Sequence, residues 1–322
     1  MKYVSIDFKK YRQIDVYSRE NGIFEYQAIN PQNEEIRKNH NNFFLKISKW
    51  NRYQHIGEYI ASTIAKSIGF KCCDVNIYKE KLEGSMFPIT GTISYVETSK
   101  FDKILTPRDI VKTYRKTTNS QAPNQWVYSV DTILNATFKK MQEEKRPYDE
   151  FLRFKQDLIN MIMFDIKFMN PDRDESNWLI RQSAKSGEID LYPMFDNAAI
   201  LGLEMDVALD SRGGDHQLLV DRMDRLRPYL IVTQNSEISG KTEESYDVLL
   251  RYILSKYPEQ AKKSLKAVNS FTTDDLKSQL EDIDELDIER KKFVIDLFNQ
   301  RGKRVNEIYQ EFRSKESLQK QE

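Results

Sequence analysis

The sequence predicts a two-lobed α+β fold, in which a small antiparallel β-sheet with one helix precedes a larger, mostly helical lobe. Short β-forming segments fill most of residues 1–97, and a single amphipathic helical pattern interrupts them. Helical patterns dominate from residue 98 onward. A chain of 322 residues is long enough for two lobes that each have a core. We therefore expect an N-lobe over residues 1–97 and a C-lobe over residues 98–322.

Composition argues against several classes of protein. Lys plus Arg and Asp plus Glu both number 50, so no net field attracts nucleic acid or an anionic membrane. The first residues, MKYVSIDFKK, lack the apolar stretch of a signal peptide, and no run approaches membrane-spanning length. The adjacent pair Cys72 and Cys73 cannot form a normal disulfide framework. We expect a cytoplasmic protein without a membrane span, and delivery into another cell is left open.

The N-lobe is expected to contain several short strands and one helix. The predicted strands are KYVSID, QIDVYS, IFEYQAI, FFLKIS, CDVNIYKE and MFPITGTISYVE, with a turn at Asn21-Gly22. Isoleucines recur at every fourth position from Ile56 to Ile68, which predicts an amphipathic helix that ends at Gly69. This helix is expected to lie across the sheet.

The C-lobe begins with a helix signal in TPRDIVKTYRK, where Thr106 is the expected N-cap and Pro107 the first helical residue. A second helix is predicted in YSVDTILNATFKKMQEE. The run EFLRFKQDLINMIMFDIKFM is apolar almost all round, which indicates a helix buried in a larger core. WLIRQ and EIDLYPMF predict a β-hairpin, and the chain beyond Asp210 is expected to be mostly helical.

The loop NPDRDESN, between the buried helix and the hairpin, concentrates carboxylate and amide groups. The segment does not fit an EF-hand calcium loop, because Asn177 stands at the position that needs glycine and Ser183 at the position that needs the bidentate glutamate. Phosphoryl transfer explains the pattern better. It needs an Asp to accept the proton of the attacking hydroxyl, and oxygen ligands for magnesium. Asp172 and Asn177 have the required five-residue spacing, and the hairpin delivers Asp196 in FDNA.

Phosphoryl transfer also requires a strand lysine for the phosphates, oriented by a helix glutamate. Lys46 is the charged residue of the strand FFLKIS, and Glu58 lies at the rim of the apolar face of the following helix. Taken alone, Lys46 is more simply a charge on an edge strand, and Glu58 a solvated residue. Their joint spacing favours an ion pair. For Arg173 two roles stay open, a phosphate contact or a partner of Asp174.

At these residues the chain resembles the HipA/CtkA-type bacterial Ser/Thr kinases, which share a distant kinase fold with the phosphoinositide kinases. NPDRDESNWLI and LYPMFDNA resemble the catalytic and metal loops of that group. LKIS and GEYIASTIAKSIG resemble its nucleotide lysine and helix glutamate regions, and SYVE resembles its hinge. The resemblance covers residues 43 to about 200. It departs at Asp174, where the group often has histidine, and in the lack of a glycine-rich loop before Lys46.

The resemblance implies a two-lobed, protein-kinase-like fold that uses ATP and Mg²⁺. It implies roles for eight residues: Asp172 as catalytic base, Asn177 and Asp196 as metal ligands, Lys46 as phosphate contact held by Glu58, and the backbone of Tyr95, Val96 and Glu97 as adenine site.

The expected activity is phosphorylation of Ser or Thr on a protein, the kinase itself included. An antitoxin or other regulatory partner is suggested by the resemblance alone, and no binding of nucleic acid by the chain itself is expected. Two alternatives stay open. The acceptor is a lipid or small molecule, or the protein is a nucleotide-binding pseudokinase that docks a partner.

Overall fold

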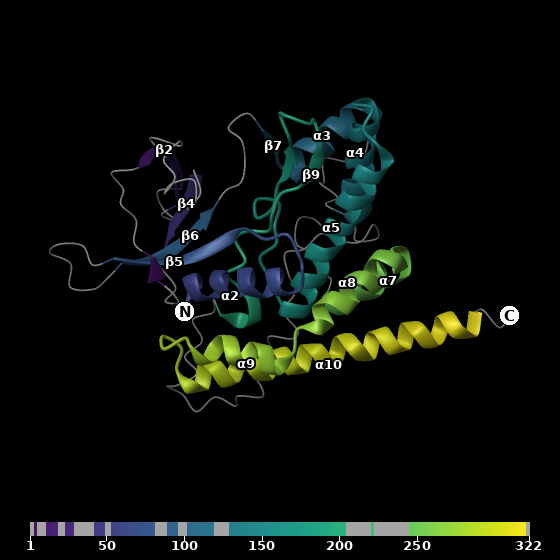
Figure 1. The fold of residues 1–322 in the computed structure, drawn as a ribbon. Helices are drawn as coiled ribbons and strands as arrows, with labels where there is room; N and C mark the ends of the chain where they lie inside the picture. The colour runs from purple at the N-terminus through teal and green to yellow at the C-terminus, as the bar shows by residue number, and fades with distance from the viewer. Residues whose placement is uncertain are drawn as a thin grey trace.

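The computed structural model describes residues 3–4, 11–18, 23–28, 42–48, 53–80, 89–95, 102–118, 129–203, 220–221 and 245–319. These residues form a sheet-rich part and a larger, mostly helical part, as Figure 1 shows. The predicted two-lobed α+β architecture is therefore confirmed. The predicted boundary at Glu97 lies outside the described residues.

The N-terminal sheet is built from six strands with the order β1-β5-β6-β4-β3-β2. The strands are β1 (Tyr3–Val4), β2 (Tyr11–Ser18), β3 (Ile23–Ala28), β4 (Asn42–Ile47), β5 (Asp74–Glu80) and β6 (Ile89–Tyr95). All neighbours are antiparallel except the pair β1 and β5. Lys46 on β4 is paired with Ile23 on β3 and with Thr92 on β6. It therefore lies on an interior strand, which rules out the edge-strand interpretation. The predicted turn at Asn21-Gly22 lies outside the described residues.

One helix of the N-lobe, α2 (Gln54–Ser67), follows β4 and packs against the sheet. Its isoleucines at 56, 60 and 64 are fully buried, as their four-residue spacing predicts. The chain leaves the helix at Gly69, whose φ of +76° is a left-handed conformation that suits glycine. At Gly57 the helix touches the loop after the β-hairpin, because an added Cβ would overlap the carbonyl oxygen of Ala198.

The C-lobe contains most of the helices. They are α3 (Pro107–Thr118), α4 (Val130–Glu143), α5 (Tyr148–Phe168), α7 (Tyr246–Lys256), α8 (Pro258–Ser270), α9 (Thr273–Glu281) and α10 (Ile288–Gln319), with a short 3₁₀ turn, η2 (Ile200–Gly202). Thr106 caps α3 as predicted: its hydroxyl accepts from the Asp109 amide at 3.2 Å, and its own amide donates to the Asp109 carboxylate at 3.0 Å. Helix α5 crosses the centre of the lobe, and α10 runs along its base (Figure 1).

A second, three-stranded antiparallel sheet lies beside α5, in the order β7-β8-β9. It contains the predicted hairpin, β8 (Ile180–Gln182) and β9 (Ile189–Leu191), and a strand that the sequence pattern did not predict, β7 (Lys103–Leu105). Strand β7 has only three residues, two of them exposed, so it carries no hydrophobic alternation to detect.

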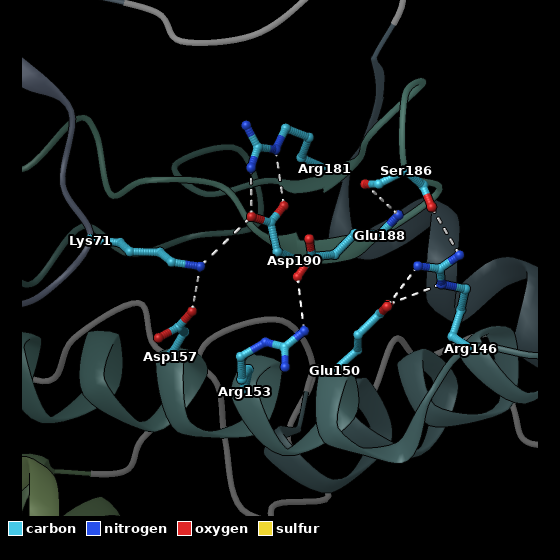
Figure 2. Close-up of polar contacts among 9 residues, drawn as sticks. All are labelled: Lys71, Arg146, Glu150, Arg153, Asp157, Arg181, Ser186, Glu188 and Asp190. Atoms are coloured by element: carbon cyan, nitrogen blue, oxygen red, sulfur yellow. Dashed lines mark hydrogen bonds and ion pairs between the residues drawn. The ribbon is translucent and has the colours of Figure 1, made fainter.

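Ion pairs anchor this hairpin on α5, as Figure 2 shows. Arg153 on α5 contacts Glu188 at 3.0 Å. Lys71 lies between Asp157 on α5, at 2.7 Å, and Asp190 on β9, at 3.7 Å. The hairpin is therefore held in a defined position between the two loops that flank it.

The close approach at Gly57 generates a stability prediction. We expect Gly57→Ala to lower the free energy of unfolding by about 1–3 kcal/mol, because the new methyl group meets backbone that cannot rotate away. Gly302→Ala is the comparison: there the added methyl meets the end of the Lys167 side chain, which can rotate where backbone cannot, and alanine favours a helix by up to about 1 kcal/mol. Urea denaturation measures both, and equal stability of the two variants would contradict the contact.

Candidate active site

The loop that follows α5 is shaped by hydrogen bonds to the end of that helix. Met169 ends α5 in a left-handed conformation, with φ 53° and ψ 58°. The Asn170 amide then donates to the carbonyl of Asp165 at 3.0 Å, and its side chain donates to the Asp165 carboxylate at 3.1 Å. The Asp172 amide donates to the side-chain oxygen of Asn170 at 3.3 Å. Asp172 is thus placed by contacts that begin inside the helix.

Arg173 is fully buried and connects three segments of the chain. Its guanidinium donates two hydrogen bonds to the Asp165 carboxylate on α5, at 2.9 and 3.0 Å. One nitrogen also donates to the carbonyls of Asn177, at 2.7 Å, and Phe195, at 3.0 Å. A further hydrogen bond goes to the side-chain oxygen of Asn197. The loop that follows α5 and the loop that follows β9 are therefore fastened to each other and to α5.

Both roles that the sequence left open for Arg173 are wrong. A guanidinium with no exposed surface cannot reach a phosphate in a solvent-accessible cleft, and its carboxylate partner is Asp165, not Asp174. Asp174 instead accepts hydrogen bonds at 2.6 Å from the amide and the hydroxyl of Ser176 in its own loop. Burial by itself lowers the pKa of Arg173, but the charge and hydrogen bonds of Asp165 outweigh it and raise that pKa. The arginine stays protonated.

Lys46 and Asp196 meet across the two lobes. The Lys46 Nζ lies 2.5 Å from Asp196 Oδ1, and the two side chains are 21% and 26% exposed. Asp196 has a φ of 52°, a left-handed conformation that is uncommon for residues other than glycine. Such a backbone persists where surrounding contacts hold it, and it is found often at functional sites. Here the contacts are those of Arg173 to the residues on either side, Phe195 and Asn197.

Glu58 is buried beside this pair, but its hydrogen bonds go to Asn197, the residue that follows Asp196. The side chain of Glu58 accepts hydrogen bonds from the backbone amide and the side-chain amide of Asn197. The sequence predicted that Glu58 holds Lys46, whereas the carboxylate that contacts Lys46 is Asp196. The reason is that the loop after β9 lies against α2 at Gly57. Asp196, in that loop, therefore reaches Lys46 in place of Glu58.

The electrostatic environment of Glu58 favours its protonated form. Burial is the largest cause and the charge of Asp196 adds to it, and together they raise the pKa of Glu58 from 4.5 to about 7. Lys46, the Asn197 amide and Arg173 act in the opposite direction. A buried carboxylate with a pKa near neutrality beside a lysine and a second carboxylate is typical of a functional site.

Asn177 and Asp172 both lie in the loop that follows α5. The Asn177 side-chain nitrogen donates to the Asp172 carbonyl at 2.6 Å, and the Asn177 side-chain oxygen accepts a longer hydrogen bond from the Ser176 hydroxyl, at 3.3 Å. The described residues hold no cluster of three or more His, Cys, Asp or Glu side chains around a metal position. The Asn177 and Asp196 oxygens fit magnesium, which takes one or two protein oxygens and keeps several waters. Through Arg173, the backbones of these two loops are held next to each other.

An apolar cluster lies between the lobes beside these polar groups. It contains the buried residues Cys73 and Tyr192, with the partly buried residues Phe44, Leu179 and Phe195 packed against them. Phe44 lies two residues before Lys46 on β4, and therefore on the same face of the sheet. Leu179 follows Asn177 by two residues in the chain, and Phe195 directly precedes Asp196. The sequence analysis did not predict this cluster.

The predicted hinge is partly described. Tyr95 is the last residue of β6, while Val96 and Glu97 lie outside the described residues. A cavity of about 330 Å³ shares Cys73 and Tyr192 with the apolar cluster and has Tyr95 in its wall. Lys46 and Asp196 do not line it. This cavity is therefore separate from the place where the polar groups meet.

No protein-family model and no curated protein match the sequence. Among solved structures, the proinflammatory kinase CtkA of Helicobacter pylori matches with a TM-score of 0.67 over 92% of this chain and 94% of that chain, at 15% identity. This chain has the fold of a HipA/CtkA-type kinase.

HipA of Shewanella oneidensis MR-1, solved in a toxin–antitoxin complex with HipB and operator DNA, has the same fold. It matches with a TM-score of 0.50 over 95% of this chain and 67% of that chain, at 11% identity. The resemblance inferred from the two loop motifs is thus confirmed at the level of the HipA/CtkA fold. No helix in the described ranges is long and apolar enough to cross a membrane.

The site also contains residues that the sequence analysis missed, Asp165 and Asn197. Asp165 interrupts the apolar run INMIMFDI, and a charge in such a run signals a buried partner. Nothing in the sequence marked Asn197 as a site residue, since an asparagine is common in loops of every kind.

The buried arginine generates the second prediction. Arg173→Met should lower the free energy of unfolding by about 3–5 kcal/mol, because it leaves the Asp165 carboxylate buried without its partner. Arg153→Gln is the control: it breaks an ion pair of the same type whose arginine is 59% exposed, and should cost less than about 1 kcal/mol. Urea denaturation gives both values, and a small loss in Arg173→Met would show that the three segments do not depend on this residue.

The raised pKa of Glu58 generates the third prediction. Because the folded-state pKa of about 7 exceeds 4.5, the folded protein binds this proton more tightly than the unfolded chain. The resulting stability is fully present below pH 4.5 and is lost as the pH rises through about 7. Glu58→Gln cannot ionise, so its stability relative to wild type should increase with pH between these values, by at most about 1.4 kcal/mol per pH unit. Denaturation without nucleotide or metal across this range tests it, and parallel pH profiles would refute it.

Proposed function

We propose that the protein is an ATP- and Mg²⁺-dependent kinase that transfers the γ-phosphate to Ser or Thr of a protein, itself included. The observation that carries the proposal is the contact of Lys46 with Asp196 across the lobes, at 2.5 Å, in a fold shared with CtkA and HipA. A lysine from the sheet and an aspartate from the helical lobe are the groups that phosphoryl transfer requires on either side of a nucleotide.

The phosphates would enter between Lys46 and Asp196. Lys46 would then exchange its carboxylate partner for oxygens of the α- and β-phosphates, and Asp196 would turn to the metal. Asn177 and Asp196 would hold that Mg²⁺, which supplies positive charge to offset the charge that gathers on the transferred group. Glu58 would act as a positioning residue, because its contact with Asn197 holds the loop that contains Asp196.

Asp172 is the proposed catalytic base. It orients the acceptor hydroxyl and takes its proton, while the hydroxyl oxygen forms a bond to the γ-phosphorus. The bond between that phosphorus and the bridging oxygen breaks, and ADP leaves with the electron pair. Asp172 is half-buried and its loop is fixed by Asn170 and Arg173, so that the carboxylate would reach the acceptor without reorganisation of the loop.

The apolar cluster is the proposed surface for the purine ring. Phe44 would cover one side of the ring and Leu179 and Phe195 the other, next to the lysine and aspartate that bind the phosphates. The backbone of Tyr95, Val96 and Glu97 would supply the hydrogen bonds to adenine. Which residues cover the phosphates in place of a glycine-rich loop is not assigned, since residues 29–41, directly before β4, lie outside the described ranges.

For the acceptor and the partners we rely on the proposed kinase activity and on analogy with the HipA complex. A protein acceptor and a cytoplasmic setting are the proposal, and a regulatory partner of the antitoxin kind is proposed by analogy with HipA, which was solved with HipB. Lipid or small-molecule phosphorylation, and partner docking without catalysis, are the competing proposals.

The fourth prediction concerns the two carboxylates. Incubation with Mg²⁺ and ATP should add phosphate to the wild-type protein in single steps of mass. Asp172→Asn and Asp196→Asn should each slow this by at least about 100-fold, because the base or the metal ligand is lost. Asp174→Asn, in the same loop but bonded to Ser176, should keep the rate within about tenfold. Intact-protein mass spectrometry measures all four proteins.

The outcomes separate the competing functions. Wild-type rates in either variant of Asp172 or Asp196 would remove the site assignment. ADP formation that needs an added lipid or small molecule, without gain of protein mass, would favour the alternative acceptor. Thermal stabilisation by Mg²⁺ and ATP without any ADP would favour a nucleotide-binding module.

A further inference from the structure

The N-terminus of α2, the helix that carries Glu58, has no cap of its own. Its N-cap residue is Tyr53, which makes no side-chain capping hydrogen bond, and its first turn holds no acidic residue. The first amides of a helix carry partial positive charge and favour a nearby carboxylate. His55, in this first turn, is 2% exposed and therefore also needs a buried polar partner.

Glu285, far along the sequence, supplies a carboxylate to His55 in this first turn. It lies in the connection between α9 and α10, which Figure 1 shows beneath α2. One carboxylate oxygen lies 2.7 Å from His55 Nε2, and the other lies 3.1 Å from Lys79 Nζ on β5. The flanking residues Ile283 and Leu286 are buried, at 0% and 3% exposure, so that the backbone of Glu285 is anchored in the core.

A second contact reinforces the same junction. The guanidinium of Arg290, on α10, lies over the ring of Tyr53 at 5.1 Å. Arg290 is 4% exposed and Tyr53 is 7% exposed, so this cation–π contact is buried. The start of α10 and the connection before it thus both contact the N-terminal end of α2, at Tyr53 and at His55.

The other end of this turn contacts the candidate active site. Glu58 lies three residues after His55, within one turn of helix, and accepts hydrogen bonds from Asn197. Gly57, between them, packs on the backbone of Ala198. A displacement of His55 would therefore move Glu58 with it, because one helical turn behaves as a rigid unit.

We propose that Glu285 is a positioning residue, which holds α2 through His55 and so keeps Glu58 against the loop that carries Asp196. The segment 282–287 acts as a brace between the C-terminal helices and the N-lobe. In its effect on activity this inference rests on the proposed kinase function, but the brace itself is a physical coupling that exists with or without catalysis. Any event that draws this segment away from α2 would loosen the site from a distance.

The test compares Glu285→Gln with a matched control, Lys79→Met, in the full-length protein. Both variants break a contact of the same carboxylate, but only the first weakens its bond to α2. In Glu285→Gln, backbone hydrogen exchange should rise about tenfold in residues 55–60 and 195–199, and the kcat for Mg-ATP turnover should fall about tenfold, as expected for one hydrogen bond to a charged group. Lys79→Met should leave both within about twofold.

A double variant distinguishes positioning from loss of packing. If His55 acts through Glu285, the double variant His55→Gln/Glu285→Gln should show the same hydrogen exchange and the same kcat as Glu285→Gln alone. Losses in the double variant that equal the sum of the losses in His55→Gln and Glu285→Gln would overturn the brace. Unchanged exchange in residues 195–199 of Glu285→Gln would overturn it as well. Raised exchange with unaltered kcat would leave the physical coupling in place but would overturn the role of Glu285 as a positioning residue for activity. If the wild-type protein turned over no ATP, the proposed function would fail, while the exchange data would still decide the brace.

Discussion

The buried ion pair of Arg173 with Asp165 is the constraint on which the candidate active site depends. A charged pair without exposed surface is costly to desolvate, and its stability requires that every donor of the guanidinium finds an acceptor. Those acceptors are the carbonyls of Asn177 and Phe195 and the side chain of Asn197. The pair therefore determines more than local stability. It sets the distance between the loop with the proposed base and the loop with the proposed metal ligand.

The second constraint acts from the N-lobe. Helix α2 presents a glycine, Gly57, and a buried carboxylate, Glu58, to the loop after β9. The absence of a side chain at Gly57 permits backbone contact, and the carboxylate binds the amide that follows Asp196. Lys46 on β4 completes the contact between the lobes. The loop of Asp196 is thus held by Arg173 on one side and by α2 on the other, which explains how an aspartate with a left-handed backbone is kept there.

The sequence predicted most of the regular elements and offered candidate site residues, but it did not predict Asp165, Asn197 or the way in which the side chains pair. Hydrophobic period identified α2 and α5, β-forming runs identified β2 to β6, and the spacing of Asp172, Asn177 and Asp196 marked the loops. Pairing depends on tertiary contacts that no local pattern encodes. Lys46 contacts Asp196, 150 residues away, and His55 contacts Glu285, 230 residues away. For Arg173 the sequence left open a phosphate contact or a pair with its neighbour Asp174, whereas the folded chain buries it against Asp165 on α5. Val96, Glu97 and the segment before β4 lie outside the described residues.

Lys46, Asp172, Asn177 and Asp196 are proposed to surround one nucleotide and its metal ion. The most direct measurement is a crystal structure of the protein with Mg²⁺ and a non-hydrolysable ATP analogue. The account predicts a triphosphate that separates Lys46 from Asp196, with the metal bound to the oxygens of Asn177 and Asp196 and the γ-phosphate facing Asp172. A nucleotide bound elsewhere, with the contact of Lys46 and Asp196 still intact, would contradict it.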